Sequence, residues 1–304
     1  MSRKPSILLT GSSGMLGATI ALGLCQKYDL YLLSKTRKMH NDKWNYIQCD
    51  LTKEDAVTDV LSNVKPDIVI NAAALSTIAE CNQSSLATQE INVRIPRELA
   101  QQSKLRNIIF IHLSTDQVYD GSKCFVTEID AHPINSYGTS KLQGEFAVLS
   151  ENENAIVLRL ALVYGLGQGG KLPFSHWLVN HIKSGKEANL FNDEYRTPLF
   201  IEDLPLLMLR IISRPTSVLG GIYNVGCHDR VSRYEFACRL ADVFKLDVAK
   251  INSVSIEVVE VNSVRPKDCS MDISKICSST DWKPTDIGAG LLKMKNQFDA
   301  NYRL

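Results

Sequence analysis

A strand, a glycine-rich turn and a helix follow one another at the start of this chain, and this order constrains the fold more than any other feature. Residues 6–10 form an apolar run that predicts a buried strand, and residues 18–24 have helical periodicity. The turn between them has the spacing G-x-x-G-x-x-G, and its glycines permit a tight turn and close approach of the backbone to a pyrophosphate. The helix N-terminus adds free N–H groups and the positive end of a dipole. We therefore favour a dinucleotide-binding turn over a plain strand-to-helix connection, with contacts from Gly11, Ser13, Gly14, Met15, Leu16 and Gly17.

Strands and helical stretches then alternate from residue 6 to about residue 165. Apolar runs that predict strands lie at residues 30–33, 46–51, 67–71, 108–113 and 156–160. This alternation predicts an α/β fold with a Rossmann-type, doubly wound, mostly parallel sheet. We expect residues 1–165 to form the dinucleotide-binding domain, with a returning segment at about 197–226. Residues 166–196 and 227–304 are then expected to form a smaller C-terminal substrate-binding lobe.

The loop after the second strand indicates which dinucleotide is bound. An acid at this place usually binds the ribose of NAD, whereas a basic residue accommodates the 2′-phosphate of NADP. Here the sequence Ser-Lys-Thr-Arg-Lys follows residue 33, without an acid. We therefore predict NADPH, with Lys35 and Arg37 as phosphate contacts, although a solvated basic loop would give the same pattern.

Further cofactor contacts are expected at the carboxyl ends of the next strands, where ligands bind in open α/β sheets. Asp50 either faces the adenine or caps the helix that follows, and small residues after the strand at 67–71 leave room for a ligand. The predicted contacts are Asp50, Leu51, Ala72, Ala73, Ala74 and Asn92.

Tyr137 and Lys141 are four residues apart, so they share one face of a helix. A fixed ammonium beside a phenol favours the phenolate and lowers the pKa of the tyrosine. Such a tyrosine can give a proton to a carbonyl that is being reduced to an alcohol. Thr115 follows the strand at 108–113 and is placed at the same edge of the sheet, where its hydroxyl either bonds a substrate carbonyl or caps a turn. Thr115, Tyr137 and Lys141 are therefore the predicted catalytic residues.

Composition excludes several other classes of protein. The 304 residues carry a net charge of only +1, which gives no global field for nucleic acid or for an anionic membrane. No apolar run approaches the length of a membrane span, and the short apolar run at the N-terminus passes at once into the glycine turn, which argues against a signal peptide. The eight cysteines form no CxxC pair and have no histidine at metal-ligand spacing, so we expect reduced thiols, no metal site and a cytoplasmic protein.

Together these motifs resemble the extended short-chain dehydrogenase/reductases. The resemblance rests on the glycine turn, Asn71-Ala72-Ala73-Ala74, Leu113-Ser114-Thr115-Asp116, Tyr137-xxx-Lys141 and Arg159-Leu160, in this order. Within that superfamily the chain is most similar to the dTDP-4-dehydrorhamnose reductase family, through residues 114–121, 137–145 and 265–272. The resemblance implies that Thr115 and Tyr137 hold the substrate carbonyl oxygen and that Tyr137 protonates it. It also implies that Lys141 bonds the nicotinamide ribose.

The resemblance further implies a nucleotide-sugar substrate, with contacts from Ser114, Asp116, Gln117, Arg196 and Arg265. Gln117 departs from the family, which usually has an aromatic residue there. Related sugar-nucleotide dehydratases carry an Asp-Glu pair, in which the glutamate acts in water elimination. An amide cannot remove a proton, so Asp116-Gln117 favours simple reduction. A guanidinium suits phosphate at Arg196 and Arg265, although a surface salt bridge would also explain each arginine.

Two other functions stay open at this point. The same fold serves as a non-catalytic, NADP-binding regulatory subunit of methionine adenosyltransferase, which resembles the reductase family closely. A sugar-nucleotide epimerase is a third option, but it would hold NAD, and the basic loop at residues 35–38 argues against it. The glycine-rich stretch at 165–170 is either a lid over the sugar site or a connector. The sequence also leaves a homodimer open.

Overall fold

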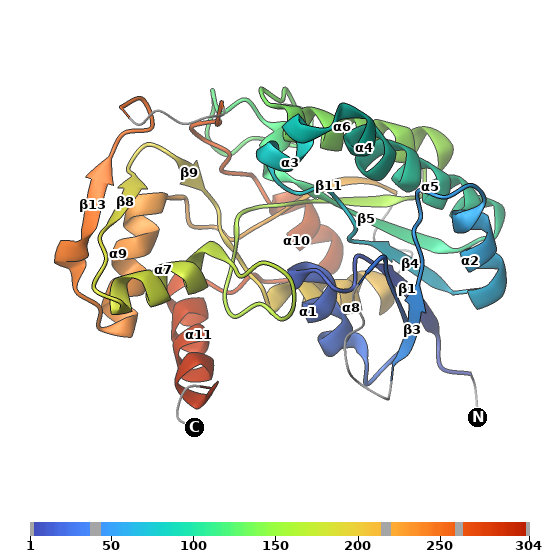
Figure 1. The fold of residues 1–304 in the computed structure, drawn as a ribbon, viewed down its shortest axis with the longest axis horizontal. Coiled ribbons are helices and arrows are strands. Elements are labelled where there is room, and N and C mark those ends of the chain that lie inside the picture. Colours follow the sequence, from blue (N-terminus) through green and yellow to red (C-terminus); the bar gives the residue numbers. More distant parts are fainter. Residues whose placement is uncertain (1–2, 37–43, 214–219, 259–263, 302–304) are drawn as a thin grey trace.

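Seven parallel strands form one central sheet in this computed structural model, which describes residues 3–36, 44–213, 220–258 and 264–301. The strand order is β11-β6-β5-β4-β1-β2-β3 (Figure 1). The order reverses between β1 and β4, and the crevice at such a switch point is where open α/β sheets bind ligands. The strands are β1 (Ser6–Thr10), β2 (Asp29–Ser34), β3 (Asn45–Gln48), β4 (Ile68–Asn71), β5 (Ile109–Thr115), β6 (Ile156–Leu160) and β11 (Gly221–Val225).

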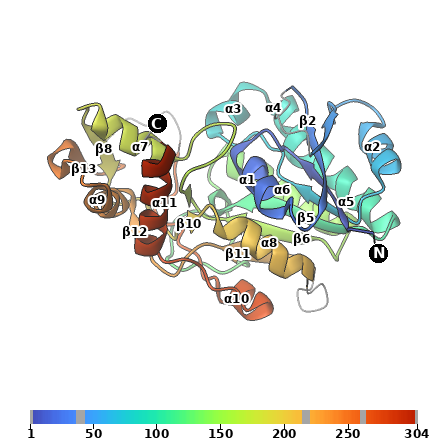
Figure 2. The same cartoon turned by 90° about the horizontal axis from the view of Figure 1, so that it is seen from below.

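Helices cover both faces of this sheet (Figures 1 and 2). Successive side chains of a strand point to opposite faces, so Ile7 and Leu9 pack with one helical layer and Leu8 with the other. Such a strand reads as a continuous apolar run, as the sequence of β1 does. The first layer contains α1 (Met15–Leu24), α8 (Asp203–Ser213) and α10 (Ser274–Thr280), and the second contains α2 (Ala56–Val64), α5 (Ile95–Leu105) and α6 (Ser136–Glu151).

Shorter helical pieces occupy the carboxyl edge of the sheet. They follow β4 and β5, the strands that end beside the switch point. These are α3 (Ile78–Gln83), α4 (Ser85–Gln89), the π-helical turn η1 (Glu90–Arg94) and the 3₁₀ turn η2 (Asp116–Val118).

A second hydrophobic core lies beyond the sheet, at the left of Figure 1. Its centre contains Tyr164, Leu178, Phe236 and Leu291, all almost fully buried. Three two-stranded sheets, β7–β10, β8–β13 and β9–β12, lie in this part of the chain, and each contributes side chains to this core. The elements are β7 (Val163–Tyr164), α7 (Phe174–Lys183), β8 (Ala188–Phe191), β9 (Tyr195–Arg196), β10 (Leu199–Phe200), β12 (Val231–Ser232), α9 (Arg233–Phe244), η3 (Val248–Lys250), β13 (Ile251–Val254) and α11 (Ile287–Asn301).

The fold confirms the predicted α/β class, the doubly wound sheet and the smaller C-terminal part. Each predicted strand is present, and α9 begins with the reciprocal hydrogen bonds of a capping box between Ser232 and Glu235. The predicted domain boundaries stay a prediction.

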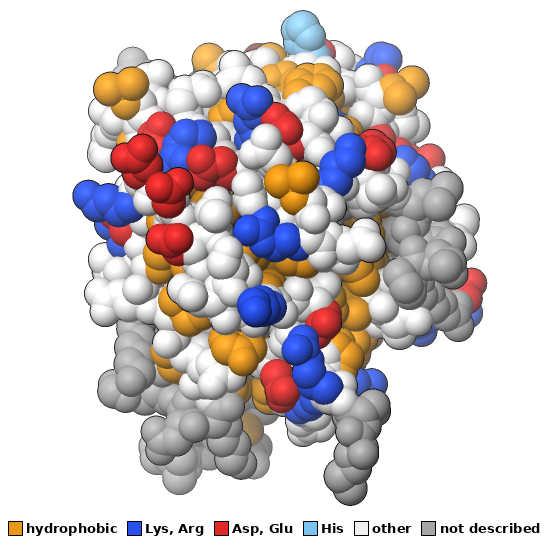
Figure 3. All heavy atoms as spheres, turned by 90° about the vertical axis from the view of Figure 1, so that its right-hand side faces the viewer, with side chains coloured by type: hydrophobic (Ala, Val, Ile, Leu, Met, Phe, Trp, Pro, Cys, Tyr) orange, Lys and Arg blue, Asp and Glu red, His pale blue; other side chains and the backbone are white. Residues whose placement is uncertain are grey.

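The helices of the described residues and the charges on one face bear on membrane and nucleic-acid binding. Among the described residues no helix is both long and apolar enough to span a bilayer. Figure 3, which views the right-hand side of Figure 1, shows acidic and basic side chains interspersed on that face. Exclusion of nucleic acid and the cytoplasmic location stay predictions.

Candidate active site

The glycine turn folds into a close-packed cradle before α1. Gly11 has a φ of 63°, and its backbone carbonyl accepts the N–H of Gly14 at 3.0 Å. A Cβ on Gly11 would lie 2.6 Å from the backbone of Ala72, and one on Gly17 would lie 2.4 Å from the carbonyl of Gly11. These glycines therefore allow β1, β4 and α1 to meet, and they leave the first N–H groups of α1 free of intrahelical bonds.

Gly11→Ala is expected to destabilise the fold by about 2–5 kcal/mol, since a left-handed residue costs about 1–2 kcal/mol and steric overlap about 1–3 kcal/mol. Urea unfolding measures the change. Gly185→Ala is the matched control, because Gly185 also has a positive φ of 81° but nothing lies within 4 Å of its added Cβ. Equal losses in the two variants would contradict the close packing of the turn.

A cavity of about 290 Å³ lies beside this turn and matches most of the predicted cofactor contacts. Lys35 reaches across its mouth to Asp50, with 2.9 Å between Nζ and Oδ2. Hydrogen bonds from Lys35 and Thr52 hold the pKa of Asp50 at about 2. Asp50 does not cap α2, whose N-cap residue is Asp55. The predicted residues that line the cavity are Gly11, Ser13, Gly14, Lys35, Asp50, Leu51, Ala72, Ala73 and Ala74; Met15, Leu16 and Gly17 form the first turn of α1, and Arg37 lies outside the described residues.

Asn92 corrects one cofactor prediction. Its side chain is fully buried, and its amide forms hydrogen bonds with other groups of the protein. Asn92 accepts from the backbone N–H of Leu75 at 2.9 Å and donates to the Leu75 carbonyl and to Ser140 Oγ. It therefore fixes the chain after β4 against α6 and does not line the cavity.

The glycine-rich stretch at 165–170 packs on the glycine turn that precedes α1. A Cβ on Gly170 would lie 2.8 Å from the backbone nitrogen of Met15, and one on Gly169 would lie 3.0 Å from the carbonyl of Ser13. Just beyond it, Lys171 forms an ion pair with Glu80 of α3 at 2.9 Å. The stretch thus packs over the start of α1, and of the two alternatives that the sequence left open, lid or connector, this packing favours a connector.

Helix α6 is placed at the sheet edge by two of its own glycines. A Cβ on Gly138 would lie 2.0 Å from the Gln117 carbonyl, and one on Gly144 would lie 2.2 Å from the Asn92 carbonyl. The closeness that these glycines allow brings Tyr137 beside the end of β5. A second cavity, of about 670 Å³, is lined there by Thr115, Gln117 and Tyr137 together with Ser76 and Thr77. Because Ala72–Ala74 line the first cavity and Ser76–Ala79 the second, the two cavities flank one stretch of chain.

The electrostatics of the tyrosine–lysine pair differ from the prediction. Burial raises the pKa of Tyr137, and an interaction with the Thr115 hydroxyl acts in the opposite direction without reversing the shift. Lys141 is almost fully buried; its Nζ donates to the Leu113 carbonyl at 2.8 Å and lies 3.3 Å from His112 Nε2. Burial lowers the pKa of Lys141 to about 8. The expected lowering of the tyrosine pKa by Lys141 is therefore wrong for this arrangement, and Tyr137 keeps its proton at neutral pH.

Ser114 corrects a substrate-contact prediction. It precedes Thr115 on β5, so the two side chains point to opposite faces of the sheet. The Ser114 hydroxyl donates to Glu145 of α6, which is held by Arg159 of β6 at 2.6 Å in a buried ion pair. Ser114 therefore belongs to the packing behind the cavity.

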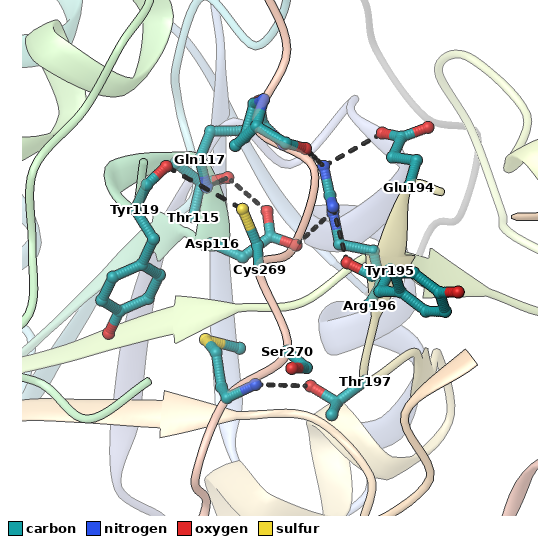
Figure 4. Close-up of polar contacts among 12 residues, drawn as sticks. Thr115, Asp116, Gln117, Tyr119, Glu194, Tyr195, Arg196, Thr197, Cys269 and Ser270 are labelled. Atoms are coloured by element: carbon teal, nitrogen blue, oxygen red, sulfur yellow. Dashed lines mark hydrogen bonds and ion pairs between the residues drawn. The ribbon is translucent and has the colours of Figure 1, made fainter. Parts of the chain in front are cut away.

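Arg196 lies in the cavity wall, but its guanidinium already pairs with carboxylates and carbonyls of the protein (Figure 4). The side chain is 2% exposed, with Nε 3.3 Å from Asp116 Oδ2 and an Nη2 hydrogen bond of 3.0 Å to Glu194. Its remaining N–H groups donate to the backbone carbonyls of Tyr195, Pro266 and Lys267. The prediction that Arg196 binds a phosphate is therefore wrong; Arg196 instead ties the end of β5 to the segment 265–268.

Two further arginines line the same cavity. Arg265 is exposed on the segment that Arg196 holds. Arg233 is the first residue of α9 and pairs with Glu194 at 3.1 Å. Neither Arg233 nor Glu194 was predicted from the sequence, where the one local signal is the capping box that begins one residue before Arg233.

The described residues contain no group of three or more His, Cys, Asp or Glu side chains that is placed to hold a metal ion. Hydroxyl, ammonium, guanidinium and carboxyl groups line the two cavities.

Comparison with known proteins gives consistent matches over most of the chain. Residues 5–299 match the family described as RmlD substrate binding domain. The probable low-salt glycan biosynthesis reductase Agl14 of Haloferax volcanii is 29% identical over 272 residues, 88% of this chain and 90% of that protein. Methionine adenosyltransferase 2 subunit beta of Xenopus laevis is 29% identical over 289 residues, 88% of this chain and 80% of that protein. The structure of dTDP-4-dehydrorhamnose reductase from Bacillus anthracis in complex with NADP superposes with a TM-score of 0.86, at 23% identity, over 97% of this chain and 100% of that one, and shows the same fold.

Proposed function

The chain belongs to the RmlD substrate binding domain family, and we propose that it is an NADPH-dependent reductase of a nucleotide-activated 4-keto-6-deoxy sugar. The observation that carries the proposal is the convergence of Thr115, Gln117 and Tyr137 in one cavity at the sheet edge. The cofactor cradle begins at the same edge. Two hydroxyl groups and an amide suit a carbonyl oxygen that must be held and then protonated.

The residues that fit the cofactor are those of the glycine cradle and the first cavity. Gly11, Ser13 and Gly14 line this cavity, and the first N–H groups of α1 suit a diphosphate. Lys35 at the cavity mouth supports NADPH, although Asp50 offsets part of its charge. When bound, the reduced nicotinamide supplies the hydride.

The chain's own residues supply the proton and orient the substrate. Tyr137 keeps its proton because burial raises its pKa, so it gives the proton only when negative charge develops on the carbonyl oxygen. Thr115 holds the same oxygen, and Gln117 accepts a hydrogen bond from Asn135, which is also the N-cap residue of α6. An amide at position 117 does not remove a proton, so elimination is disfavoured and the product is the alcohol. Arg265 and Arg233 are the candidate contacts for the substrate diphosphate.

Agl14 and the B. anthracis enzyme are named as reductases, which supports this proposal, whereas the similarity to methionine adenosyltransferase 2 subunit beta supports a second candidate. In that case the chain would bind NADP and serve as a regulatory subunit. The intact Thr115, Tyr137 and Lys141 set favours the reductase. A sugar-nucleotide epimerase ranks below both.

A panel of dTDP-, GDP- and UDP-linked 4-keto sugars tests the function. We expect oxidation of NADPH, followed at 340 nm, to depend on at least one of these sugars and to be faster than oxidation of NADH. If no sugar in the panel is reduced while NADPH still binds, the regulatory-subunit candidate takes precedence.

A further inference from the structure

A chain of buried polar side chains runs from Lys141 across the central sheet. Lys141 Nζ lies 3.3 Å from His112 Nε2 on β5, and His112 Nδ1 lies 3.0 Å from Asn71 Nδ2 on β4. Asn71 Oδ1 in turn accepts from Thr10 Oγ1 on β1 at 2.5 Å. All four side chains are at most 1% exposed. Thr10 directly precedes the cradle glycine Gly11, so this chain connects the catalytic lysine to the cofactor turn.

The orientation of the Asn71 amide decides the tautomer of His112. The amide oxygen of Asn71 faces two donors, the Thr10 hydroxyl and the backbone N–H of Ala73 at 3.3 Å. Its NH₂ group therefore points to His112 Nδ1, which must accept. Burial and the neighbouring lysine lower the pKa of His112 well below its ordinary value, so the ring is neutral. A neutral imidazole whose Nδ1 accepts carries its proton on Nε2.

This tautomer directs an N–H group at the nitrogen of Lys141. An ammonium has no lone pair and meets the N–H as a second donor, whereas a neutral amine accepts from it. We propose that His112 is a positioning residue for Lys141, locked by Asn71 as the Nε2–H tautomer, which holds the lysine nitrogen at Leu113 and favours its amine form. The catalytic consequence rests on the proposed function, but the tautomer and the lysine titration do not.

The other titratable groups that face Lys141 favour its charged form, whereas His112 favours the amine. Glu145, one turn further along α6, and Cys81 of α3 both raise the pKa of Lys141, and burial outweighs them. The charge of Glu145 is largely offset by its ion pair with Arg159. Tyr137, one turn earlier on α6, keeps its proton. Burial thus brings the pKa of Lys141 down to about 8, and on the proposed function we expect loss of its charge to set the upper pH limit of turnover.

Nitrogen-15 NMR of the imidazole rings tests the tautomer directly in the whole, uniformly labelled protein. We expect the His112 signals, assigned by their loss in His112→Phe, to show a protonated Nε2 and a bare Nδ1 between pH 6 and pH 9. A protonated Nδ1, or a ring that charges in this range, would overturn the proposal. This measurement needs no substrate, so it stands even if the keto-sugar panel gives no turnover.

Asn71→Asp is expected to switch the tautomer of His112. A carboxylate can only accept a hydrogen bond, so the His112 ring proton moves to Nδ1, which then donates to it. His112 Nε2 then accepts from the ammonium, and the titration midpoint of the Lys141 Nζ signal should rise from about 8. Wild-type turnover should fall about tenfold from pH 7 to pH 9, as expected for one group with a midpoint near 8, and the variant should lose much less. Asn45→Asp, at the start of β3, is the matched control for added charge.

An unchanged Lys141 midpoint in Asn71→Asp would overturn the proposal. If that variant does not fold, Thr10→Val replaces it, since it removes a donor that orients the Asn71 amide. A fixed Nε2–H tautomer and an unshifted lysine in Thr10→Val would contradict the role of the buried chain, whereas a mixture of tautomers would support it.

Discussion

Tyr137→Phe is expected to lower turnover by about 10²–10⁴-fold, the usual contribution of a positioned proton donor. The substitution removes one hydroxyl from the wall of the substrate cavity and keeps the ring that packs there. The cofactor cradle is untouched, so NADPH affinity should stay nearly unchanged. Stopped-flow hydride transfer and fluorescence titration of NADPH measure the two quantities separately.

Tyr31→Phe is the matched control, because Tyr31 lies on β2 and lines neither described cavity. We expect it to leave turnover near the wild-type value. Normal turnover in Tyr137→Phe together with lost NADPH binding would refute the assigned role of Tyr137. Loss of both would point to a folding defect, which circular dichroism detects.

Arg196→Met is expected to lower the free energy of unfolding by about 3–5 kcal/mol, the usual cost of removing one partner of a buried ion pair. It leaves Asp116 and Glu194 in the core, at 4% and 2% exposure, without this cation. It also removes the hydrogen bonds to the carbonyls of Pro266 and Lys267 that hold the Arg265 segment. Urea unfolding measures the loss, and a rise in the substrate KM would report the displaced segment.

The loss in Arg196→Met should depend on pH with a definite sign. Burial raises the pKa of Asp116 even in the wild type, and without Arg196 it rises further. Burial also acts to raise the pKa of Glu194, but Arg233 and Arg196 outweigh it. A carboxyl whose folded-state pKa is raised binds its proton more tightly in the folded state, so stability falls as pH rises. We therefore expect the deficit to be larger at pH 8 than at pH 5.

Arg239→Met serves as the control for Arg196→Met. Arg239 pairs with Asp229 at 3.4 Å on the surface, where both side chains are more than 40% exposed. An exposed pair contributes about 0–1 kcal/mol, so this variant should unfold almost like the wild type. A similar small loss in Arg196→Met would show that the buried pairs do not hold the segment. Partial recovery in Arg196→Met with Asp116→Asn would confirm that the stranded charge causes the loss.

Local sequence patterns predicted the strands, the glycine cradle and the placement of Thr115 and Tyr137, and each has a local cause. The period of an apolar run identifies a buried strand, and only glycine tolerates the φ of Gly11 beside Ala72. Parallel strands bring their carboxyl ends to one edge, so residues that follow successive strands converge there without any knowledge of side-chain contacts.

Long-range partners explain the predictions that failed. Arg196 was predicted as a phosphate ligand because no residue near it in the sequence indicates its ion-pair partner. That partner, Asp116, lies 80 positions earlier in the chain. Ser114 was predicted to contact the substrate because it is next to Thr115 in the sequence. Successive side chains of a strand point to opposite faces of the sheet, so Ser114 instead faces Glu145. Asn92 was placed on the right element but faces the backbone of Leu75.

The strand–turn–helix at the start of the chain, and with it the glycine cradle and the fold class, was determined by the sequence alone, because glycine stereochemistry and strand periodicity are local. The charge states at the site were decided only by the tertiary structure. Proximity of Lys141 to Tyr137 predicted a lowered tyrosine pKa, but burial acts on both groups, raising the pKa of Tyr137 and lowering that of Lys141. Desolvation depends on everything packed around a group, and the folded chain supplies that surrounding from residues far apart in the sequence.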